Sequence, residues 1–376
     1  MVITKKRLKK IMITTIIIIT IILLSPVFYM HLPLFGQEAS GTRLERMEKS
    51  PNYRDGQFHN LSPTNMMVDN KGMREMMARK FSEKKHGLRP TDSIPAIKTD
   101  LKAIAKDRDI SIWFGHSSYY IQIDGKRFLV DPVFSKHASP IPLFISAFEG
   151  TNIYSADDMP EIDYLLITHD HYDHLDFTTI KELKGKVKLV ICGLGVGAHF
   201  ERWGYDNEKI VEMDWNESQK LSEGFIINAM TSRHFSGRSL KRNSTLWLSY
   251  VLQTPSITLF LSGDGGYDKH FAEIGKRFGN IDLAFLETGQ YNEKWKLIHS
   301  LPSQVALETK DLNARRVIPI HWGKFSLADH HWKEPIEKLM EINKDNDINI
   351  LTPIIGEIIE LKDESQVFSL WWENLK

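Results

Sequence analysis

The chain has 376 residues, of which 42% are apolar and 26% are charged, as is typical of a folded globular protein. Lysine plus arginine and aspartate plus glutamate both number 48, so the formal net charge is zero, whereas a nucleic-acid-binding protein usually carries a basic excess. The single cysteine, Cys192, excludes a disulfide framework and a cysteine-rich zinc site.

The first 30 residues have the pattern of a membrane anchor. KKRLKK at 5–10 is strongly basic, and residues 11–30 contain no charged side chain. Twenty helical residues span about 30 Å, the thickness of the hydrocarbon core, and basic residues before the apolar run place that end in the cytoplasm. We expect an uncleaved membrane helix with the rest of the chain outside the cytoplasm. The alternative is a cleaved signal peptide, which leaves the protein secreted.

Two further segments follow the anchor. Residues 31–108 are polar and irregular, which predicts a linker with one or two amphipathic helices, including the Met-rich MREMMARKF at 73–81. Residues 109–376 alternate short β-rich runs with helical stretches. We expect this third segment to be one α/β (α+β) domain with two sheets sandwiched between helices.

The predicted elements of the third segment follow from runs of branched, aliphatic and aromatic residues. Strands are expected at SIWF, YYIQI, RFLVD, DYLLITH, KVKLVIC, GFIINAM, TLWLSYVL, SITLFLSGD, IDLAFLE, RRVIPIHW and INILTPIIGEIIEL. Asp124–Gly125 predicts a hairpin turn between the second and third of these. Helices are expected at about 176–184, 196–203, 268–278, 302–313 and 331–343.

Four candidate metal ligands lie in THDHYDHLD at 168–176, directly after the apolar run YLLI. They are His169, His171, Asp173 and His174, and their nitrogen and oxygen atoms suit zinc, iron or manganese. Strand alternation sends the first three to one side, and a tight turn brings His174 round to it. Four ligands are too many for one tetrahedral site with an open position. The stretch therefore predicts two adjacent metal ions, whose charge offsets the crowding of polar groups.

Three more polar residues follow apolar runs and can converge at the same rim of a sheet: His234, Asp264 and His321. We assign His169, His171 and His234 to one metal ion. Asp173, His174 and His321 are assigned to the other, and Asp264 is expected to bridge the two. A bridging water or hydroxide, with its pKa lowered towards about 7, is the predicted nucleophile.

This ordered set, with SGDGGY around Asp264 and PIHWG around His321, resembles the metallo-β-lactamase superfamily of hydrolases from about residue 110 to 361. The resemblance implies a four-layer αββα sandwich with a dinuclear site at one edge of the sheets. WFGHSSYYIQIDGKRFLVDPVF and KLIHSLPSQVALE are similar to the N-acylphosphatidylethanolamine-hydrolysing phospholipase D branch. That branch uses zinc to cleave a phosphodiester, which releases an N-acylethanolamine and phosphatidic acid.

Roles beyond the ligands come from the branch resemblance for His299 and from position near the site for other residues. His299 matches a family histidine near the substrate phosphate, and we expect catalytic roles for Asp173, His299 and His116. His299, Tyr291 and Trp322 are the expected substrate-binding residues. Three features depart from the branch: Asp170 replaces a common asparagine, ETGQ precedes Tyr291 in place of a more apolar turn, and 31–108 does not align clearly.

The sequence therefore predicts a membrane-tethered phosphodiesterase with two divalent metal ions, most simply Zn²⁺, with iron or manganese as alternatives. Its substrate is expected to be a phospholipid or another small molecule. A lactonase or other cyclic-ester hydrolase keeps the same site and changes the bond. A surface protein that binds metal without turnover is the alternative of another class. The sequence makes no prediction about oligomeric state.

Overall fold

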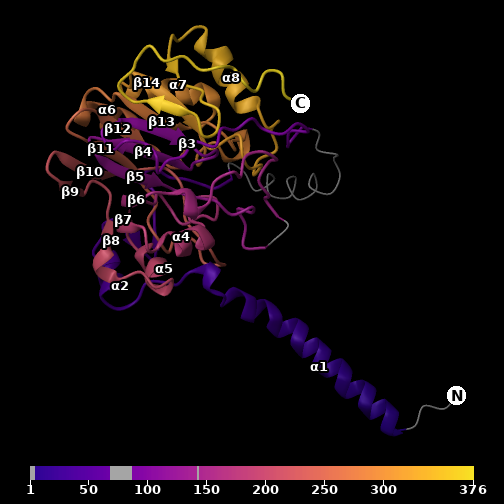
Figure 1. Ribbon diagram of the computed structural model, residues 1–376. Coiled ribbons are helices and arrows are strands. Elements are labelled where there is room, and N and C mark those ends of the chain that lie inside the picture. The colour runs from indigo at the N-terminus through magenta and orange to yellow at the C-terminus, as the bar shows by residue number, and fades with distance from the viewer. Residues whose placement is uncertain (1–4, 68–86, 142–143) are drawn as a thin grey trace.

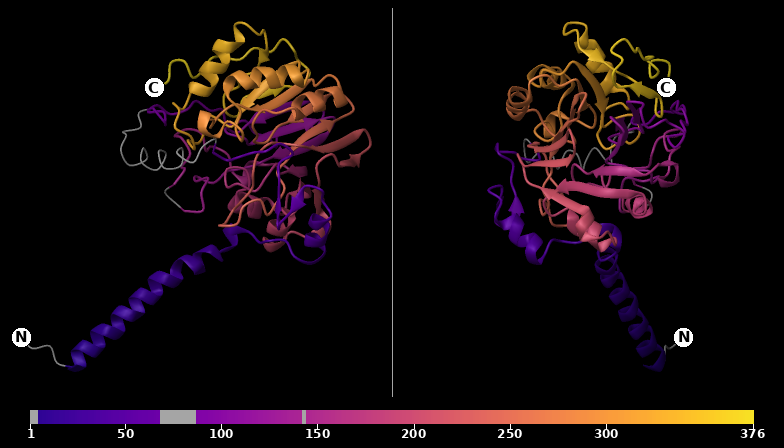
Figure 2. Two further views of the ribbon diagram at one scale, coloured as in Figure 1. Left: turned by 180° about the vertical axis from the view of Figure 1, so that it is seen from behind. Right: turned by 60° about the vertical axis from the view of Figure 1, so that its left-hand side comes forward.

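The computed structural model describes residues 5–67, 87–141 and 144–376 (Figure 1). The predicted Met-rich helix at 73–81 lies outside these residues. Helix α1 (Lys5–Met30) projects from the rest of the molecule (Figures 1 and 2), and it is the one helix in the described parts of the chain that is long and apolar enough to cross a membrane. Its 26 residues correspond to about 39 Å, more than the hydrocarbon thickness.

The segment after α1 packs along the large domain. It contains η1 (Pro33–Phe35), α2 (Gly41–Glu48) and the short hairpin β1 (Tyr53–Arg54) and β2 (Gln57–Phe58). Helix α2 is one of the amphipathic helices expected between 31 and 108. Asn60 bonds the backbone of His234 and the indole of Trp247, so this part of the segment is docked onto the domain.

The large domain has two seven-stranded sheets. The first has the order β16-β3-β4-β5-β6-β7-β8. Its strands are β3 (Ile110–Trp113), β4 (Tyr119–Ile123), β5 (Lys126–Val130), β6 (Ile162–Leu166), β7 (Val187–Gly193), β8 (Ile210–Met213) and β16 (Ile358–Glu360). The hairpin at Asp124–Gly125 joins β4 to β5, with both turn residues at positive φ, as the turn signal predicts.

The second sheet has the order β15-β14-β13-β12-β11-β10-β9. Its strands are β9 (Ser218–Ser222), β10 (Phe225–Met230), β11 (Ser249–Gln253), β12 (Thr258–Leu261), β13 (Leu283–Glu287), β14 (Arg316–Ile320) and β15 (Asn349–Ile350). Strands β12, β13 and β14 are parallel, and β10 runs in the same direction because β11 is antiparallel to both β10 and β12. The carboxyl ends of β10, β12, β13 and β14 therefore lie at the same edge of the sheet.

Helices cover the outer face of each sheet, which gives a four-layer αββα sandwich (Figures 1 and 2). The helices are α4 (Phe177–Leu183), α5 (Gly197–Arg202), α6 (His270–Phe278), α7 (Pro302–Asp311) and α8 (Glu334–Asn343), with short η2 (Ala156–Asp158) and η3 (Asn207–Lys209). Tyr119 of β4 stacks on Phe285 of β13 across the sheets, and Tyr120 faces the helical side. Strands buried on both faces in this way read as continuous apolar runs.

Two details of the sheets differ from the sequence prediction. Strands β8 and β9 were not expected, because IVEM and SQKLS are mostly polar or half-exposed edge segments without a clear apolar run. INILTPIIGEIIEL forms two strands, β15 and β16, in different sheets. Gly356 between them has φ 85°, and an added Cβ would lie 1.8 Å from the Ile97 carbonyl oxygen, so the turn from one sheet to the other requires glycine here.

Candidate active site

The first ligand group lies in the loop between β6 and α4. His171 accepts backbone hydrogen bonds from His174 (3.1 Å) and Leu175 (2.8 Å), which closes the tight turn that the sequence predicts. Asp176 then caps α4 by accepting from the backbone N–H groups of Thr178 and Thr179. The helix therefore begins immediately after the cluster and fixes where the loop ends.

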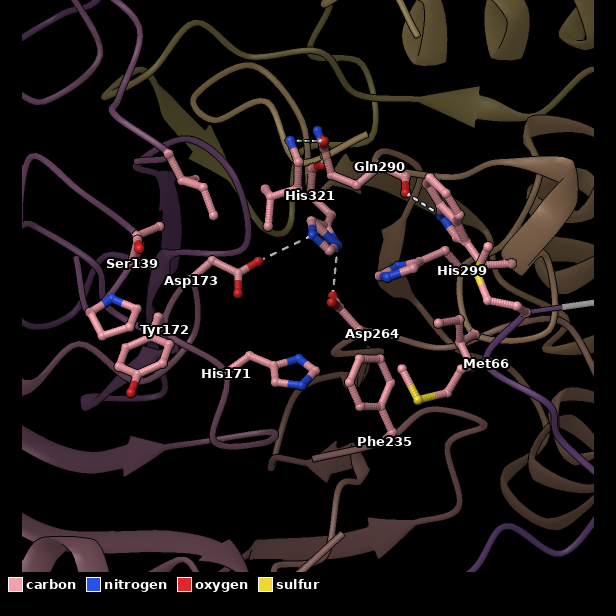
Figure 3. A pocket seen from close by; sticks show the side chains of 17 residues that line it. Met66, Ser139, His171, Tyr172, Asp173, Phe235, Asp264, Gln290, His299 and His321 are labelled. Carbon is pink, nitrogen blue, oxygen red and sulfur yellow. Dashed lines mark hydrogen bonds and ion pairs between the residues drawn. The ribbon is translucent and has the colours of Figure 1, made fainter. Parts of the chain in front are cut away.

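Three strand ends of the second sheet bring the remaining ligands to this loop, and Figure 3 shows two of them, Asp264 and His321. His234 follows β10, Asp264 follows β12 and His321 follows β14, and all three are at most 3% exposed. Asp264 lies at the centre. Its Oδ1 is 3.2 Å from His174 Nε2 and 2.7 Å from His321 Nδ1, while Oδ2 is 3.8 Å from the Nε2 atoms of His169 and His234.

The described residues form three groups that can each hold a cation. The first is His169, His171, His234 and Asp264, and the second is His116, Asp173, His174 and His321. The third is Asp264, Glu287, His299 and His321, so it shares Asp264 with the first group and His321 with the second. Within each group the candidate ligand atoms lie within 4.8 Å of one another. His174 Nε2, Asp264 Oδ1 and both ring nitrogens of His321 are buried without a hydrogen-bond partner among these residues. Such atoms are costly unless something binds them, so the residues fit the metal ions that the fold implies.

Burial sets the charge of these groups. Burial and the neighbouring His174 ring hold the pKa of His169 well below its ordinary value, so this ring is neutral, the form that binds metal. Burial opposes ionisation of Asp264, but the His174 and His321 rings outweigh it and hold the pKa of that carboxyl well below its usual range. Burial opposes the charge on His174, but the Asp264 and Asp173 carboxylates outweigh it and raise the pKa of this ring well above its ordinary value, so a bound metal ion would replace a proton there. Imidazole nitrogens around an ionised carboxylate are a donor set suited to divalent ions.

Hydrogen bonds orient several ligands. The Asp131 carboxylate lies 2.8 Å from His174 Nδ1 and accepts from the backbone and hydroxyl of Thr168. The backbone carbonyl oxygen of Ile298 lies 2.8 Å from His234 Nδ1. In both rings Nδ1 is engaged, which leaves Nε2 for a metal ion. The sequence analysis did not select Asp131, although it ends the apolar run RFLV in the way that Asp264 ends SITLFLSG.

His116 lies behind Asp173 and does not line the cavity described below. Its Nε2 is 2.9 Å from Asp173 Oδ2, and burial lowers the pKa of His116 to about 3, so the neutral ring can donate to that oxygen. His116 (φ 54°) and His321 (φ 66°) both have left-handed backbones, and each is tied to the other segment by a backbone hydrogen bond. Strained backbone of this kind persists where surrounding contacts fix it, as at functional sites.

A cavity of about 360 Å³ opens onto His171, Asp173, Asp264 and His321. Its other walls are mostly apolar: Met66, Met67, Ala138, Pro140, Ile145, Phe235, Trp295, Ile298 and Leu327. Met66 and Met67 come from the segment before the large domain, so that segment forms part of the wall. None of the described residues that line the cavity is a lysine or arginine.

Two of the expected substrate-binding residues do not reach this cavity. Tyr291 bonds Glu334 (2.7 Å) and stacks on His330, while Trp322 is 1% exposed, bonds the Pro319 carbonyl and stacks against Trp113. The aromatic walls come instead from Phe235, Tyr172 and Trp295. Trp322 lies beyond the end of β14, directly after the left-handed backbone of His321 (φ 66°), and its ring is stacked between Trp113 and Trp371.

His299 does line the cavity, where its ring points towards His321 and Asp264 (Figure 3). Its Nδ1 bonds Glu287, a residue that the sequence analysis did not select. Glu287 is 2% exposed. Burial and the Asp264 carboxylate raise the pKa of Glu287, and a bound cation would oppose that shift. Glu287 could have been selected from the sequence, because it directly follows the apolar run IDLAFL at the end of a predicted strand.

Asp170 and the basic residues around His234 hold the loops together. Asp170 accepts from the backbone of Gly237 (2.7 Å) and the hydroxyl of Thr245 (2.9 Å), and its Oδ2 is 3.3 Å from His199 Nε2. The Arg238 guanidinium donates to the backbone carbonyls of Asp170, Leu175 and Leu34. The departure at position 170 therefore affects loop anchoring rather than the ligand set.

The αββα sandwich and the histidine- and aspartate-rich edge define a metal-dependent hydrolase. A family model described as "Beta-lactamase superfamily domain" matches residues 126–322. The chain belongs to the metallo-β-lactamase superfamily, near the N-acylphosphatidylethanolamine-hydrolysing phospholipase D branch, and it is an enzyme.

The chain is similar to two sequence relatives and to a solved structure. It is 35% identical to an uncharacterized protein of Mycobacterium tuberculosis, over 90% of this chain and 91% of that one. It is 30% identical to N-acyl-phosphatidylethanolamine-hydrolyzing phospholipase D 1 of Caenorhabditis elegans, over 67% of this chain and 75% of that one. A solved structure, a possible metal-dependent hydrolase from Veillonella parvula, superposes with a TM-score of 0.55 at 15% identity, covering 68% of this chain and all of the other.

Proposed function

We propose that this enzyme hydrolyses a phosphodiester bond in a phospholipid such as an N-acylphosphatidylethanolamine, with two divalent metal ions in its site. The observation that carries the proposal is the apolar cavity that opens directly onto the ligand cluster around Asp264. A cluster without such walls would serve any small polar ester. The name of the Caenorhabditis elegans relative supports the same substrate class.

Seven side chains would hold the ions, and zinc is the proposed metal, with iron or manganese as alternatives. His169, His171 and His234 would bind one ion, Asp173, His174 and His321 the other, and Asp264 both. When bound, two such ions supply Lewis-acid charge that stabilises the negative charge growing on the phosphoryl oxygens. Asp173 is proposed as a catalytic ligand because it lines the cavity, and His116 is proposed to act through Asp173.

The charge of the cavity walls favours a diester over a monoester. None of the described residues that line the cavity is a lysine or arginine, so no basic side chain there would neutralise a second phosphate charge. A phosphodiester carries one negative charge, whereas a phosphomonoester carries about −1.5 to −2 at neutral pH.

The remaining residues would bind and orient the substrate. His299 presents its ring to the cavity and is proposed to hydrogen-bond a phosphate oxygen or the leaving group. Phe235, Trp295 and Ile298 would hold an acyl chain and exclude water from the reacting bond. Helix α1 is proposed to remain attached and to span the membrane, with the catalytic domain outside the cytoplasm.

The test is a substrate panel on the purified full chain, loaded with zinc in detergent. We expect release of N-acylethanolamine from its phospholipid and turnover of a simple phosphodiester, with much slower turnover of a phosphomonoester. Asp264→Asn should lower the metal content. It should also lower kcat/KM by more than about 100-fold, since even residues that only orient ligands contribute about 10–100-fold.

His59→Ala provides the matched control, because this histidine lies outside the ligand groups and bonds only the Arg54 carbonyl. It should keep two metal ions per chain and full activity. A zinc-loaded enzyme that turns over lactones and leaves every phosphodiester intact would overturn the substrate assignment. That alternative has its own support in the cavity volume, which lies near the lower end of the range for small-molecule sites.

A further inference from the structure

Glu287 is a buried carboxylate between the two ligand-bearing strands of the second sheet. It ends β13, which pairs in parallel with β12 on one side and β14 on the other. Asp264 follows β12 and His321 follows β14, so Glu287 occupies the position between them at the same sheet edge. A carboxylate that is 2% exposed costs several kcal/mol unless its oxygens are bonded or paired.

Both oxygens of Glu287 have protein partners. Oε2 accepts from the backbone N–H of Gly265 at 2.7 Å, and Oε1 bonds His299 Nδ1. Oε1 is also 3.4 Å from His321 Nδ1, beyond normal hydrogen-bond length. Glu287 lies in the third group of possible ligands, with Asp264, His299 and His321. One of its oxygens is held by Gly265 and the other bonds His299, so the side chain connects these two segments.

The bond to Glu287 determines which nitrogen His299 offers to the cavity. His299 lies between η4 (Glu293–Trp295) and α7, and its side chain is 14% exposed. Two bound cations would favour the ionised form of Glu287. An ionised carboxylate at Nδ1 holds the proton of the ring on that nitrogen and fixes the orientation of the ring. Nε2 is then the nitrogen left for a ligand, and the ring faces the cavity (Figure 3).

We propose that Glu287 is a positioning residue, which holds His299 with its proton on Nδ1 and with Nε2 turned towards the substrate. The inference rests on the proposed function for the role of His299, although the arrangement of Glu287 and His299 is independent of the substrate. The pair also gives a reason for the glutamate in the ETGQ sequence, because a carboxylate offers two separate acceptor oxygens, one for Gly265 and one for His299.

The first test is Glu287→Gln in the zinc-loaded full chain. An amide has only one acceptor oxygen, so it can satisfy Gly265 or His299 but not both. We expect kcat to fall about 10–100-fold, KM to change less than about threefold and metal content to stay at two ions per chain. Loss of one metal ion would overturn the proposal, because it would make Glu287 a ligand.

A double-mutant cycle separates positioning from a general structural role. If Glu287 acts through His299, the variant carrying both Glu287→Gln and His299→Gln should be no slower than His299→Gln alone. Additive losses would show that Glu287 acts elsewhere and would overturn the proposal. Thermal melting of each variant identifies any loss of activity that comes from unfolding.

A spectroscopic readout covers the case in which Glu287→Gln fails to fold or the substrate assignment fails. In ¹⁵N-histidine-labelled, zinc-loaded wild-type protein, the signals missing from the His299→Gln spectrum belong to His299. We expect its Nδ1 to be protonated and its Nε2 to be unprotonated or exchanging with solvent. A proton fixed on Nε2 alone would overturn the role of Glu287, and this result requires no turnover of any phosphodiester.

Discussion

Asp264 is the residue at which the two halves of the site meet. One carboxylate oxygen faces His174 and His321, and the other faces His169 and His234. This placement requires the tight backbone around SGDGG, where a Cβ on Gly265 would lie 2.4 Å from Ser232 Oγ and one on Gly266 would lie 2.3 Å from the Leu297 carbonyl oxygen. The glycines therefore allow the strand end to approach both neighbouring loops closely.

At the residue scale, Trp295 and Trp322 should behave differently although both are tryptophans near the site. Trp295 lines the cavity, so Trp295→Ala should remove about 2 kcal/mol of contact with an acyl chain, or roughly 30-fold in kcat/KM, with little change in melting temperature. Trp322 is packed behind His321, so Trp322→Ala should lower the free energy of unfolding by about 3–5 kcal/mol.

The measurements are lipid-hydrolysis kinetics and chemical denaturation on the same two variants. Tyr291→Phe is a further comparison, because its hydroxyl bonds Glu334 outside the cavity, and it should leave KM unchanged. If Trp322→Ala raised KM while leaving stability intact, Trp322 would contact substrate after all, as its place next to His321 in the sequence suggests.

At the scale of elements, the parallel strands explain why so much of the site could be predicted. His234, Asp264 and His321 each follow a buried apolar run, and strands that run in one direction bring such residues to one edge. Two sheets sandwiched between helices could be predicted because short runs of branched, aliphatic and aromatic residues alternate along the chain with helical stretches. Tyr291 and Trp322 could not be placed, because the direction of a side chain beyond a strand end depends on local backbone such as Gln290 at φ 61°.

Arg238 joins two elements that are distant in sequence. Its guanidinium donates to the carbonyls of Asp170 and Leu175 in the ligand loop and to Leu34 after α1, and it lies 4.1 Å from the Tyr172 ring centre. Removing it leaves several buried carbonyls without a donor. Arg238→Ala should therefore lower the free energy of unfolding by about 2–4 kcal/mol and speed proteolysis between residues 31 and 40.

Limited proteolysis with mass spectrometry and denaturant melts would measure these effects. Arg242→Ala is the control, because this exposed arginine lies in the same loop without contacting the ligand-loop carbonyls. Equal proteolysis of the two variants would mean that segment 31–38 is held by other contacts, such as the bond from the Gln37 backbone to His199.

At the scale of the whole molecule, the anchor helix and the cavity are connected. The Tyr29 hydroxyl, in the last turn of α1, donates to the Pro140 carbonyl at 2.5 Å, and Pro140 lines the cavity. Near this wall Ile141 and Phe144 expose 48% and 54% of their surface. The domain boundaries at 30/31 and 108/109 stay predictions, although residues around Asn60, Met66 and Met67 are integrated with the catalytic domain.

A chain starting at residue 31 should keep its metal content and its activity on substrate dispersed in detergent, because the ligand groups lie entirely within 116–321. It should lose membrane association, since α1, the proposed anchor, is long and apolar enough to cross a bilayer. On phospholipid vesicles its rate should fall at least about 10-fold, because an untethered enzyme must find the surface by diffusion. Carbonate extraction of membranes and paired assays on micelles and vesicles measure the two effects. Equal vesicle rates for the two chains would show that α1 serves only as a signal segment and that substrate reaches the cavity without help from the anchor.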